Sequence, residues 1–199
     1  YEQEALDLTS YAKGQWVIDH SRDAVDVDGD GFRDLAILTL PNGGNSEVPV
    51  AMLYGNGDGT FESPDRVFRH NDGQCGGSPA NALLFADFDA NEVGDLLMGF
   101  DDDGDAGSGW LYPGELTAVG TSGKVTFDFD VRNCAEVIDI NPDDESGGEN
   151  PGVGESARNF DFNFDGHQDV MVGYHYETAW KPPSRTELWF GNGDGTFEL

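Results

Sequence analysis

Three short segments of the sequence place carboxylate and amide side chains at alternating positions. They read DVDGDGFRD (residues 26–34), DFDANEVGD (residues 87–95) and DFNFDGHQD (residues 161–169), each with Asp or Asn at positions one, three, five and nine. Oxygen ligands at alternating positions of a tight turn can converge on one hard cation, and calcium accepts six to eight of them with tolerant geometry. The segments therefore predict three calcium sites of one kind.

The position within each segment predicts the role of each residue. Side chains at positions one, three, five and nine bind the ion, the main-chain carbonyl of position seven adds an oxygen, and a glycine at position six permits the sharp turn. The predicted ligand sets are Asp26, Asp28, Asp30, Phe32 and Asp34; Asp87, Asp89, Asn91, Val93 and Asp95; and Asp161, Asn163, Asp165, His167 and Asp169. Glu92 replaces the glycine of the second segment and Gly94 follows two positions later, so we expect that site to be distorted or weaker.

Two other interpretations of these segments compete with a calcium site. An Asx-rich turn without metal explains one such segment, but three in register would crowd carboxylates that repel by roughly 4 kcal/mol at about 4 Å and an effective dielectric of 20. An EF-hand needs a bidentate Glu at position twelve and flanking helices. Position twelve is Ile37, Met98 or Val172, within strand-like runs, which excludes the EF-hand.

Composition and charge narrow the class of protein. The 199 residues include 39 acidic and 10 basic residues, for a formal net charge of −29, which disfavours nucleic acids and anionic membrane surfaces as partners. No apolar run reaches the roughly 18 residues needed to span a bilayer, so we expect no membrane insertion. With 28 glycines, nine prolines and no long helix-forming stretch, the chain is predicted to be all-β.

The acidic segments belong to a longer repeat. Each precedes an apolar run, and a second landmark follows it: LYGNGDGTFE from Leu53, LYPGE from Leu111 and WFGNGDGTFE from Trp189. Periods of about 60 to 75 residues indicate stacked or radially arranged units, and a four-stranded antiparallel unit is a β-propeller blade. GNGDGTF, once per unit and without Lys, predicts a hairpin turn with left-handed glycines rather than a phosphate loop.

The expected strands follow the hydrophobic pattern. They lie near residues 22–27, 34–40, 48–55 and 60–69; 81–88, 95–100, 109–113 and 124–132; and 157–162, 169–176 and 185–191. Residues 14–19 predict a fourth strand of a preceding or closing unit. One domain over 1–199 is expected, with repeats near 20–72, 78–134 and 155–199 and an acidic connecting loop at 141–156.

The motifs DVDGDGFRDLAIL and LYGNGDGTF, with their two recurrences, resemble the FG-GAP and VCBS repeats of integrin-α-like β-propellers over about residues 20–199. The resemblance implies a calcium-binding β-hairpin between the first two strands of each blade. It also implies an extracellular or cell-surface recognition or adhesion module that binds a protein or glycan. We expect no enzyme, because the sequence lacks G-x-S-x-G, H-E-x-x-H and a Walker lysine loop and its four histidines are scattered. A noncatalytic domain of a polysaccharide-active enzyme is an alternative.

The loops of a meander divide between its two ends, so the acidic turns and the GNGDG turns are expected to share one face. Long connections at the opposite face, such as residues 175–185, are where recognition would take place. There His175, Tyr176 and Trp180 are candidates for stacking on a sugar or anchoring a protein, although the aromatics could instead pack between blades.

Three units are few for a closed ring. Either the chain is part of a larger propeller, or neighbouring chains complete one another. In the second case the strand at 14–19 and the incomplete third unit would pair between chains, in a homo-oligomer, ring or filament. A structural subunit of a calcium-stabilised extracellular assembly is therefore the second functional class.

Two cysteines bear on the compartment in which the protein folds. Bridging Cys75 to Cys134 would close a loop of about 60 residues and stabilise the fold by roughly 4 kcal/mol. Two separate buried thiols are the alternative.

Overall fold

The structure is a computed structural model that describes residues 16–18, 26–27, 30–40, 48–62, 65–70, 80–102, 105–119, 124–129, 133–140, 156–173 and 186–199. Throughout these residues the regular secondary structure is β-strand. The strands are β1 (Trp16–Ile18), β2 (Leu35–Leu40), β3 (Val48–Leu53), β4 (Asp65–His70), β5 (Ala80–Ala86), β6 (Asp95–Asp102), β7 (Asp105–Tyr112), β8 (Gly114–Val119), β9 (Lys124–Phe129), β10 (Ala135–Ile140), β11 (Ser156–Phe160), β12 (Asp169–Gly173), β13 (Thr186–Gly191) and β14 (Phe197–Glu198). The predicted all-β class is confirmed for this part of the chain.

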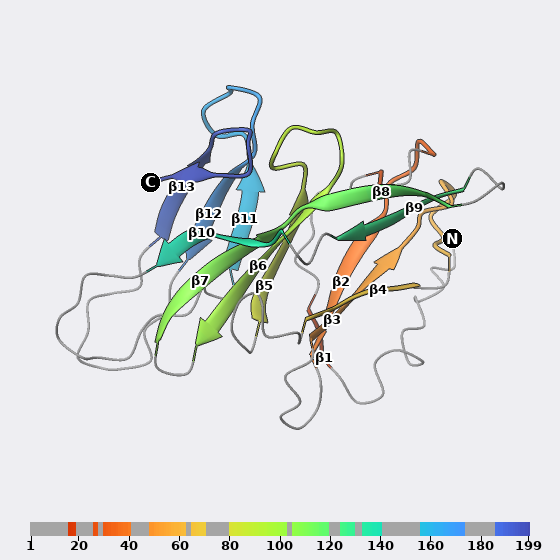
Figure 1. The fold of residues 1–199 in the computed structure, drawn as a ribbon, viewed down its shortest axis with the longest axis horizontal. Coiled ribbons are helices and arrows are strands. Elements are labelled where there is room, and N and C mark those ends of the chain that lie inside the picture. Colours follow the sequence, from red (N-terminus) through yellow and green to blue (C-terminus); the bar gives the residue numbers. More distant parts are fainter. Residues whose placement is uncertain are drawn as a thin grey trace.

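The strands form three antiparallel four-stranded sheets (Figure 1). The first sheet has the order β1-β2-β3-β4, the second β5-β6-β7-β10 and the third β11-β12-β13-β14. The hairpin β8-β9 forms a separate two-stranded sheet between β7 and β10 in sequence. Each four-stranded sheet therefore includes the strand that follows one of the three acidic segments, but β1 precedes the predicted repeat 20–72 and β10 follows the predicted repeat 78–134.

The predicted fourth strand of the second unit was wrong. Residues 124–132 were expected there, but 124–129 form β9 of the separate hairpin, and β10 pairs with β7 instead. Both segments alternate apolar and polar residues, so the pattern does not distinguish them. Ile138 of β10 lies opposite Gly109 of β7, where a Cβ on the glycine would be 2.9 Å from the Ile138 Cβ. This close approach at a glycine favours β10 beside β7.

Two further strand predictions need correction. Residues 16–18 were expected to belong to another unit, but β1 pairs with β2, with Trp16 opposite Leu40, and is the first strand of the first sheet. That sheet therefore takes its first strand from β1 and not from residues 22–27. The third sheet is completed by the short β14, with Gly191 opposite Phe197. Both segments that were expected to pair between neighbouring chains are therefore paired within the sheets of this chain.

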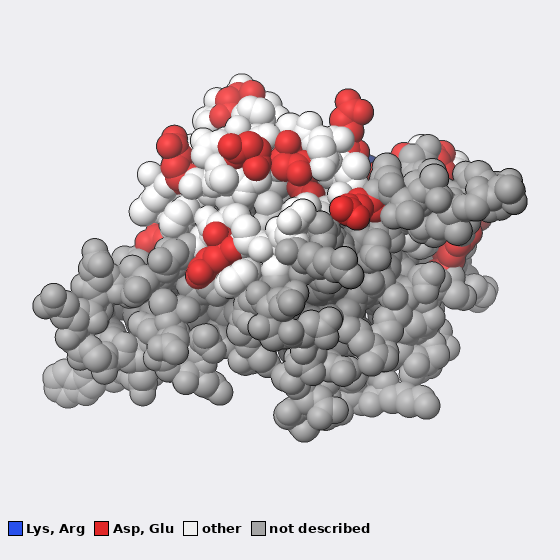
Figure 2. Space-filling view, in the orientation of Figure 1, with Lys and Arg blue, Asp and Glu red and all other residues white. Residues whose placement is uncertain are grey.

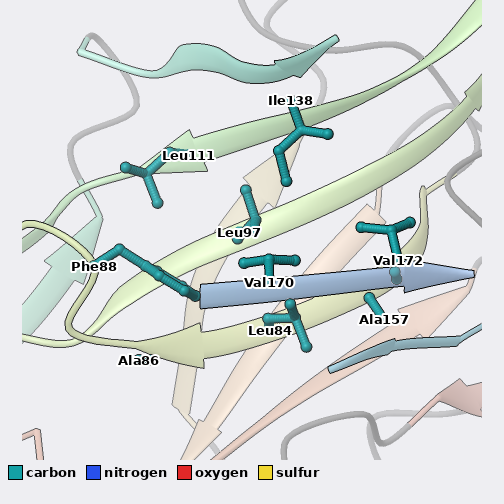
Figure 3. Packing of buried hydrophobic residues seen from close by; sticks show 10 residues of the cluster. Leu84, Ala86, Phe88, Leu97, Leu111, Ile138, Ala157, Val170 and Val172 are labelled. Atoms are coloured by element: carbon teal, nitrogen blue, oxygen red, sulfur yellow. The ribbon is translucent and has the colours of Figure 1, made fainter. Parts of the chain in front are cut away.

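One cluster of buried residues in the described part of the chain lies between the second and third sheets. The second sheet contributes Ala82, Leu84, Ala86, Phe88, Leu97, Leu111 and Ile138, and the third contributes Ala157, Val170 and Val172, with Val137, Trp189 and Phe197 partly buried around them. Figure 3 shows these side chains of the two sheets pointing toward one another. Leu83 and Leu84 are both buried, as are Leu96 and Leu97, because the second sheet is covered on both faces. Face-to-face packing thus holds successive sheets together.

The described part of the chain contains no helix long and apolar enough to cross a membrane. Among the described residues no cysteine is a free thiol, and Cys134 is half-buried. Cys75 lies outside the described residues, so its pairing with Cys134 stays a prediction.

Candidate metal centre

The three acidic segments form loops at one edge of the molecule, each leading into the second strand of a sheet (Figure 1). The turns between the third and fourth strands of the first and third sheets lie at the same edge, as predicted. Figure 2 shows acidic side chains spread over the described surface of this edge, with very little Lys or Arg. The second and third loops are described in full, and Asp28 and Gly29 of the first loop lie outside the described residues.

The aspartate at position one organises each loop. In the third loop Asp161 Oδ1 accepts the N–H of Asp165 at 3.1 Å, and Asp161 Oδ2 accepts the N–H of Gly166 at 3.0 Å. Asp26 and Asp87 accept the equivalent pairs of N–H groups at 2.8 to 3.1 Å. The same side chain thus folds the backbone back on itself in all three copies.

Position six adopts the left-handed backbone conformation in every loop. Gly31 has φ 90° and Gly166 φ 93°, while Glu92 in the second loop has φ 67°. The backbone distortion expected from Glu92 is therefore absent, and the prediction was wrong on this point. Gly94 is not a displaced turn glycine either, because a Cβ there would come 2.5 Å from the Phe85 ring, so close packing accounts for that glycine.

The aspartate at position nine is fully buried in all three loops, and both of its oxygens accept main-chain N–H groups. Asp169 Oδ2 accepts from Phe162 of its own loop at 2.7 Å, and Oδ1 accepts from Gly191 at the end of β13 at 2.9 Å. The same pairs of bonds join Asp34 to Val27 and Gly55 at 2.7 and 2.8 Å, and Asp95 to Phe88 and Gly114 at 2.8 and 2.9 Å. Each position-nine aspartate therefore clamps its loop to the third strand.

This clamp explains why the two sequence landmarks recur together. The glycine of the second landmark donates its N–H to the aspartate that ends the first. The approach is also tight, because a Cβ at Gly55 would lie 2.2 Å from the Arg33 carbonyl oxygen, and one at Gly191 equally near the Gln168 carbonyl oxygen. Sequence reasoning treated position nine only as a metal ligand and missed this role, although the constant pairing of the landmarks signalled it.

Three carboxylates of the second loop converge. Asp87, Asp89 and Asp95 each offer an oxygen, and these oxygens all lie within 4.8 Å of one another. Burial raises the pKa of Asp95 to about 6, and it also raises the pKa of Asp89, with the nearby Asp87 charge adding to the effect. A bound cation would offset both causes, because it supplies the missing opposite charge.

Position five accepts a hydrogen bond from position seven in every loop. The N–H groups of Phe32, Val93 and His167 donate to Asp30, Asn91 and Asp165 side-chain oxygens at 2.7 to 2.8 Å. The bond from His167 lowers the pKa of Asp165, with the Asn163 amide adding to the effect. The predicted carbonyl ligands at position seven stay predictions.

The GNGDGTF segments are hairpin turns, as predicted. Asn56 donates its N–H to the Thr60 carbonyl at 3.0 Å, and the Thr60 N–H and hydroxyl both donate to Asp58 at 2.9 and 2.6 Å. The turn at 192–196 repeats these bonds. The first glycine of each turn has positive φ, 75° at Gly57 and 73° at Gly193. The candidate ligand-binding residues His175, Tyr176 and Trp180 lie outside the described residues.

The fold and the loops define a β-sheet repeat in which an acidic hairpin loop is clamped to the third strand. Residues 26–98 match the FG-GAP-like repeat family, which confirms the predicted resemblance over this segment. The matching segment runs from the first acidic loop through the second, and includes the turn at 55–61. No curated protein and no solved structure matches the chain.

Proposed function

We propose that this protein is a calcium-binding recognition or adhesion module that works outside the cell or at its surface. The observation that carries the proposal is the convergence of Asp87, Asp89 and Asp95 in a loop whose backbone conformation recurs in two further copies. Three such loops along one edge would let one class of ion stabilise all three sheets.

The donor set of these loops fits calcium better than other common metals. The converging atoms are carboxylate oxygens, which hard cations prefer, and the described loops offer neither a cysteine nor a cluster of imidazoles for zinc. In the second loop Asp87, Asp89 and Asp95 would hold the ion, with Asn91 beside them. Asp95 Oδ2 accepts the N–H groups of both Phe88 and Asp89, but Asp95 Oδ1 accepts only that of Gly114 and keeps a second lone pair for a cation. The ion would supply charge neutralisation and cross-link the loop to the end of the third strand through position nine.

We further propose that the three sheets are blades of a β-propeller. Their antiparallel order and face-to-face packing, together with the FG-GAP-like match, support this arrangement. Calcium sites of extracellular modules typically require millimolar ion, so the site chemistry favours a secreted location. A bridge between Cys75 and Cys134, which stays a prediction, would agree with that location.

The role is proposed to be noncatalytic recognition of a protein or glycan. The sequence has no G-x-S-x-G, H-E-x-x-H or Walker lysine motif. His175, Tyr176 and Trp180 on the long connection at 175–185 are the proposed contact residues. A Trp180→Ala variant that kept full binding to the protein's glycan or protein ligand would contradict this part.

The test of calcium binding is thermal unfolding with calcium or with a chelator. At free calcium a hundredfold above the dissociation constant, each site would add about 2.7 kcal/mol to the free energy of unfolding. Asp89→Asn removes one predicted ligand charge at nearly constant volume. We expect it to lose a substantial part of the calcium-dependent rise in melting temperature, about one third if the three sites contribute equally.

Asp58→Asn is the matched control, because it makes the same charge change in an exposed turn residue at the same edge. It should keep the full calcium response. A melting temperature that ignores both calcium and chelator would contradict the proposal. An equal loss of response in Asp58→Asn would show that the effect is general electrostatic screening and not ligation.

A further inference from the structure

The second acidic loop is covered by the turn of the neighbouring third sheet. Gly195 in that turn donates its N–H to the Phe88 carbonyl at 3.2 Å, and Phe197 packs edge-on against the Phe88 ring at 5.7 Å. Gly195 also approaches Leu111, which a Cβ on Gly195 would reach at 2.9 Å. Phe88 is 2% exposed as a result. One sheet thus docks onto the next through a loop aromatic and a turn glycine.

The corresponding loop position in the third sheet lacks such a cover. Phe162 occupies position two of the third loop, as Phe88 does in the second, yet it is 36% exposed. Phe160 directly precedes the third acidic loop, as the buried Ala86 precedes the second, yet Phe160 is 54% exposed. Its ring lies 5.5 Å from that of Phe162 in an edge contact. The two rings form an apolar patch, here called the loop patch, at the place where the second sheet receives its neighbour.

The first sheet has a turn equivalent to the one that contains Gly195, but this turn is not docked onto a loop in the described part of the chain. Its turn at 55–61 has the same hydrogen bonds as the turn that holds Gly195, and Gly59 is the equivalent glycine, with φ 91° against 81°. Gly195 is buried, but Gly59 is exposed, and no described residue lies within 4 Å of the position that a Cβ on Gly59 would take. The first sheet therefore presents an exposed turn at 55–61, here called the donor turn, and the third sheet presents the exposed loop patch.

We propose that a second copy of this chain docks its 55–61 turn onto the loop patch of the first. The Gly59 N–H would bond to the Phe162 carbonyl, and Phe61 would lie against the Phe162 ring, as Gly195 and Phe197 do at Phe88. Such a contact is heterologous, so it leaves one free half at each end and builds rings or open chains. This contact docks one sheet on another and does not use β1 or β14, which pair within the chain. This inference does not depend on calcium.

Charge sets the conditions for the contact. Each copy carries a formal charge of −29, and the docking edge includes the acidic loops, so copies repel one another at low ionic strength. Added salt screens this repulsion while it strengthens or leaves unchanged the burial of apolar rings. Association is therefore expected to increase with salt, whereas contacts made by ion pairs would weaken.

The experiment is sedimentation velocity of the 199-residue chain at high salt with calcium present, over a roughly hundredfold range of protein concentration. We expect a sedimenting mass above the 21.5 kDa of one chain that rises with concentration. Phe162→Ser removes the acceptor ring, and Gly59→Asn places a side chain in the donor turn while tolerating positive φ. Each variant alone should sediment as a monomer. Phe164→Ser is the matched control, because Phe164 is an 84% exposed ring in the same loop. The equivalent residue of the second loop, Ala90, is exposed, so the neighbouring sheet does not cover this position.

Mixing the two variants gives the sharpest result. Phe162→Ser retains its donor turn and Gly59→Asn retains its loop patch, so an equimolar mixture should form a one-to-one complex and nothing larger. The mixture also guards against misfolding, since an unfolded variant could not restore the contact. A wild-type chain that stays monomeric, a mixture that stays monomeric, or an equal loss of association in Phe164→Ser would each overturn the proposal.

Discussion

The Asp169→Asn variant tests the hydrogen-bonding role of Asp169 separately from its proposed role as a metal ligand. Asp169 has no exposed surface, and its two oxygens accept the N–H groups of Phe162 and Gly191 at 2.7 and 2.9 Å. An Asn side chain offers one acceptor oxygen and an amide that cannot accept, so one buried N–H loses its partner. The variant thus removes one of the two bonds by which Asp169 joins the third loop to β13, while it barely changes volume.

The expected cost follows from these bonds. A hydrogen bond to a charged group contributes about 1.5 to 3 kcal/mol, and a buried N–H left without a partner costs roughly 1 to 3 kcal/mol. We expect Asp169→Asn to lower the free energy of unfolding by about 3 kcal/mol, or the melting temperature by roughly 6 to 12 °C for a chain of this size. The measurement is urea and thermal unfolding in chelator, which removes any contribution from bound metal.

The sign of the effect distinguishes two roles for this residue. If Asp169 served only as a metal ligand, its neutralisation in chelator would relieve repulsion among carboxylates and stabilise the fold. Asp165→Asn is the control, because Asp165 is exposed and an Asn there keeps an acceptor for the His167 N–H. It should change stability by less than about 0.5 kcal/mol. A loss in Asp169→Asn no larger than in this control would refute the clamp.

Two further predictions concern the same architecture. Gly191→Ala should destabilise the fold by about 1 to 3 kcal/mol in urea unfolding, because its Cβ would lie 2.2 Å from the Gln168 carbonyl oxygen. The control Gly166→Asn, at an open position with positive φ, should destabilise the fold much less. Equal losses of stability in the two variants would contradict the close approach at Gly191. In chelator, Asp95 should make the fold more stable in acid, since its pKa of about 6 exceeds the ordinary 3.8 and the folded state therefore binds the proton more tightly. This stabilisation, about 3 kcal/mol, is complete below pH 4 and is lost as pH rises through 6. The difference in unfolding free energy between the protein and Asp95→Asn should change with pH in the same way. A difference that does not change with pH would contradict the raised pKa of Asp95.

Some elements were predictable because their signals are local. The strands after each acidic segment, β2, β6 and β12, follow from apolar runs, and the turns at 55–61 and 191–197 follow from glycines that tolerate positive φ. The acidic loops were equally predictable, since their alternating oxygen side chains lie within nine residues. Glu92 misled the prediction because the aspartate at position one holds the backbone in a left-handed conformation that Glu adopts in the second loop.

The fourth strand of the second sheet depended on contacts distant in sequence. Residues 124–129 and 135–140 both have strand-like patterns, and only the approach of Ile138 to Gly109 favours the second of them. The pairing of β1 with β2 likewise joins segments across an intervening loop. Such pairings are chosen by tertiary packing, so strand propensity alone cannot rank them.

By itself the sequence determined the all-β class, the threefold repeat and the positions at which oxygen ligands cluster, because these properties reside in the types and spacing of neighbouring residues. Only the tertiary structure decided that Asp34, Asp95 and Asp169 are buried clamps, since their partners Gly55, Gly114 and Gly191 lie about 20 residues away along the chain. It also decided that Phe88 is covered while Phe162 is exposed. Equivalent residues of a repeat differ in this way because burial depends on the neighbouring sheet and not on the residue itself.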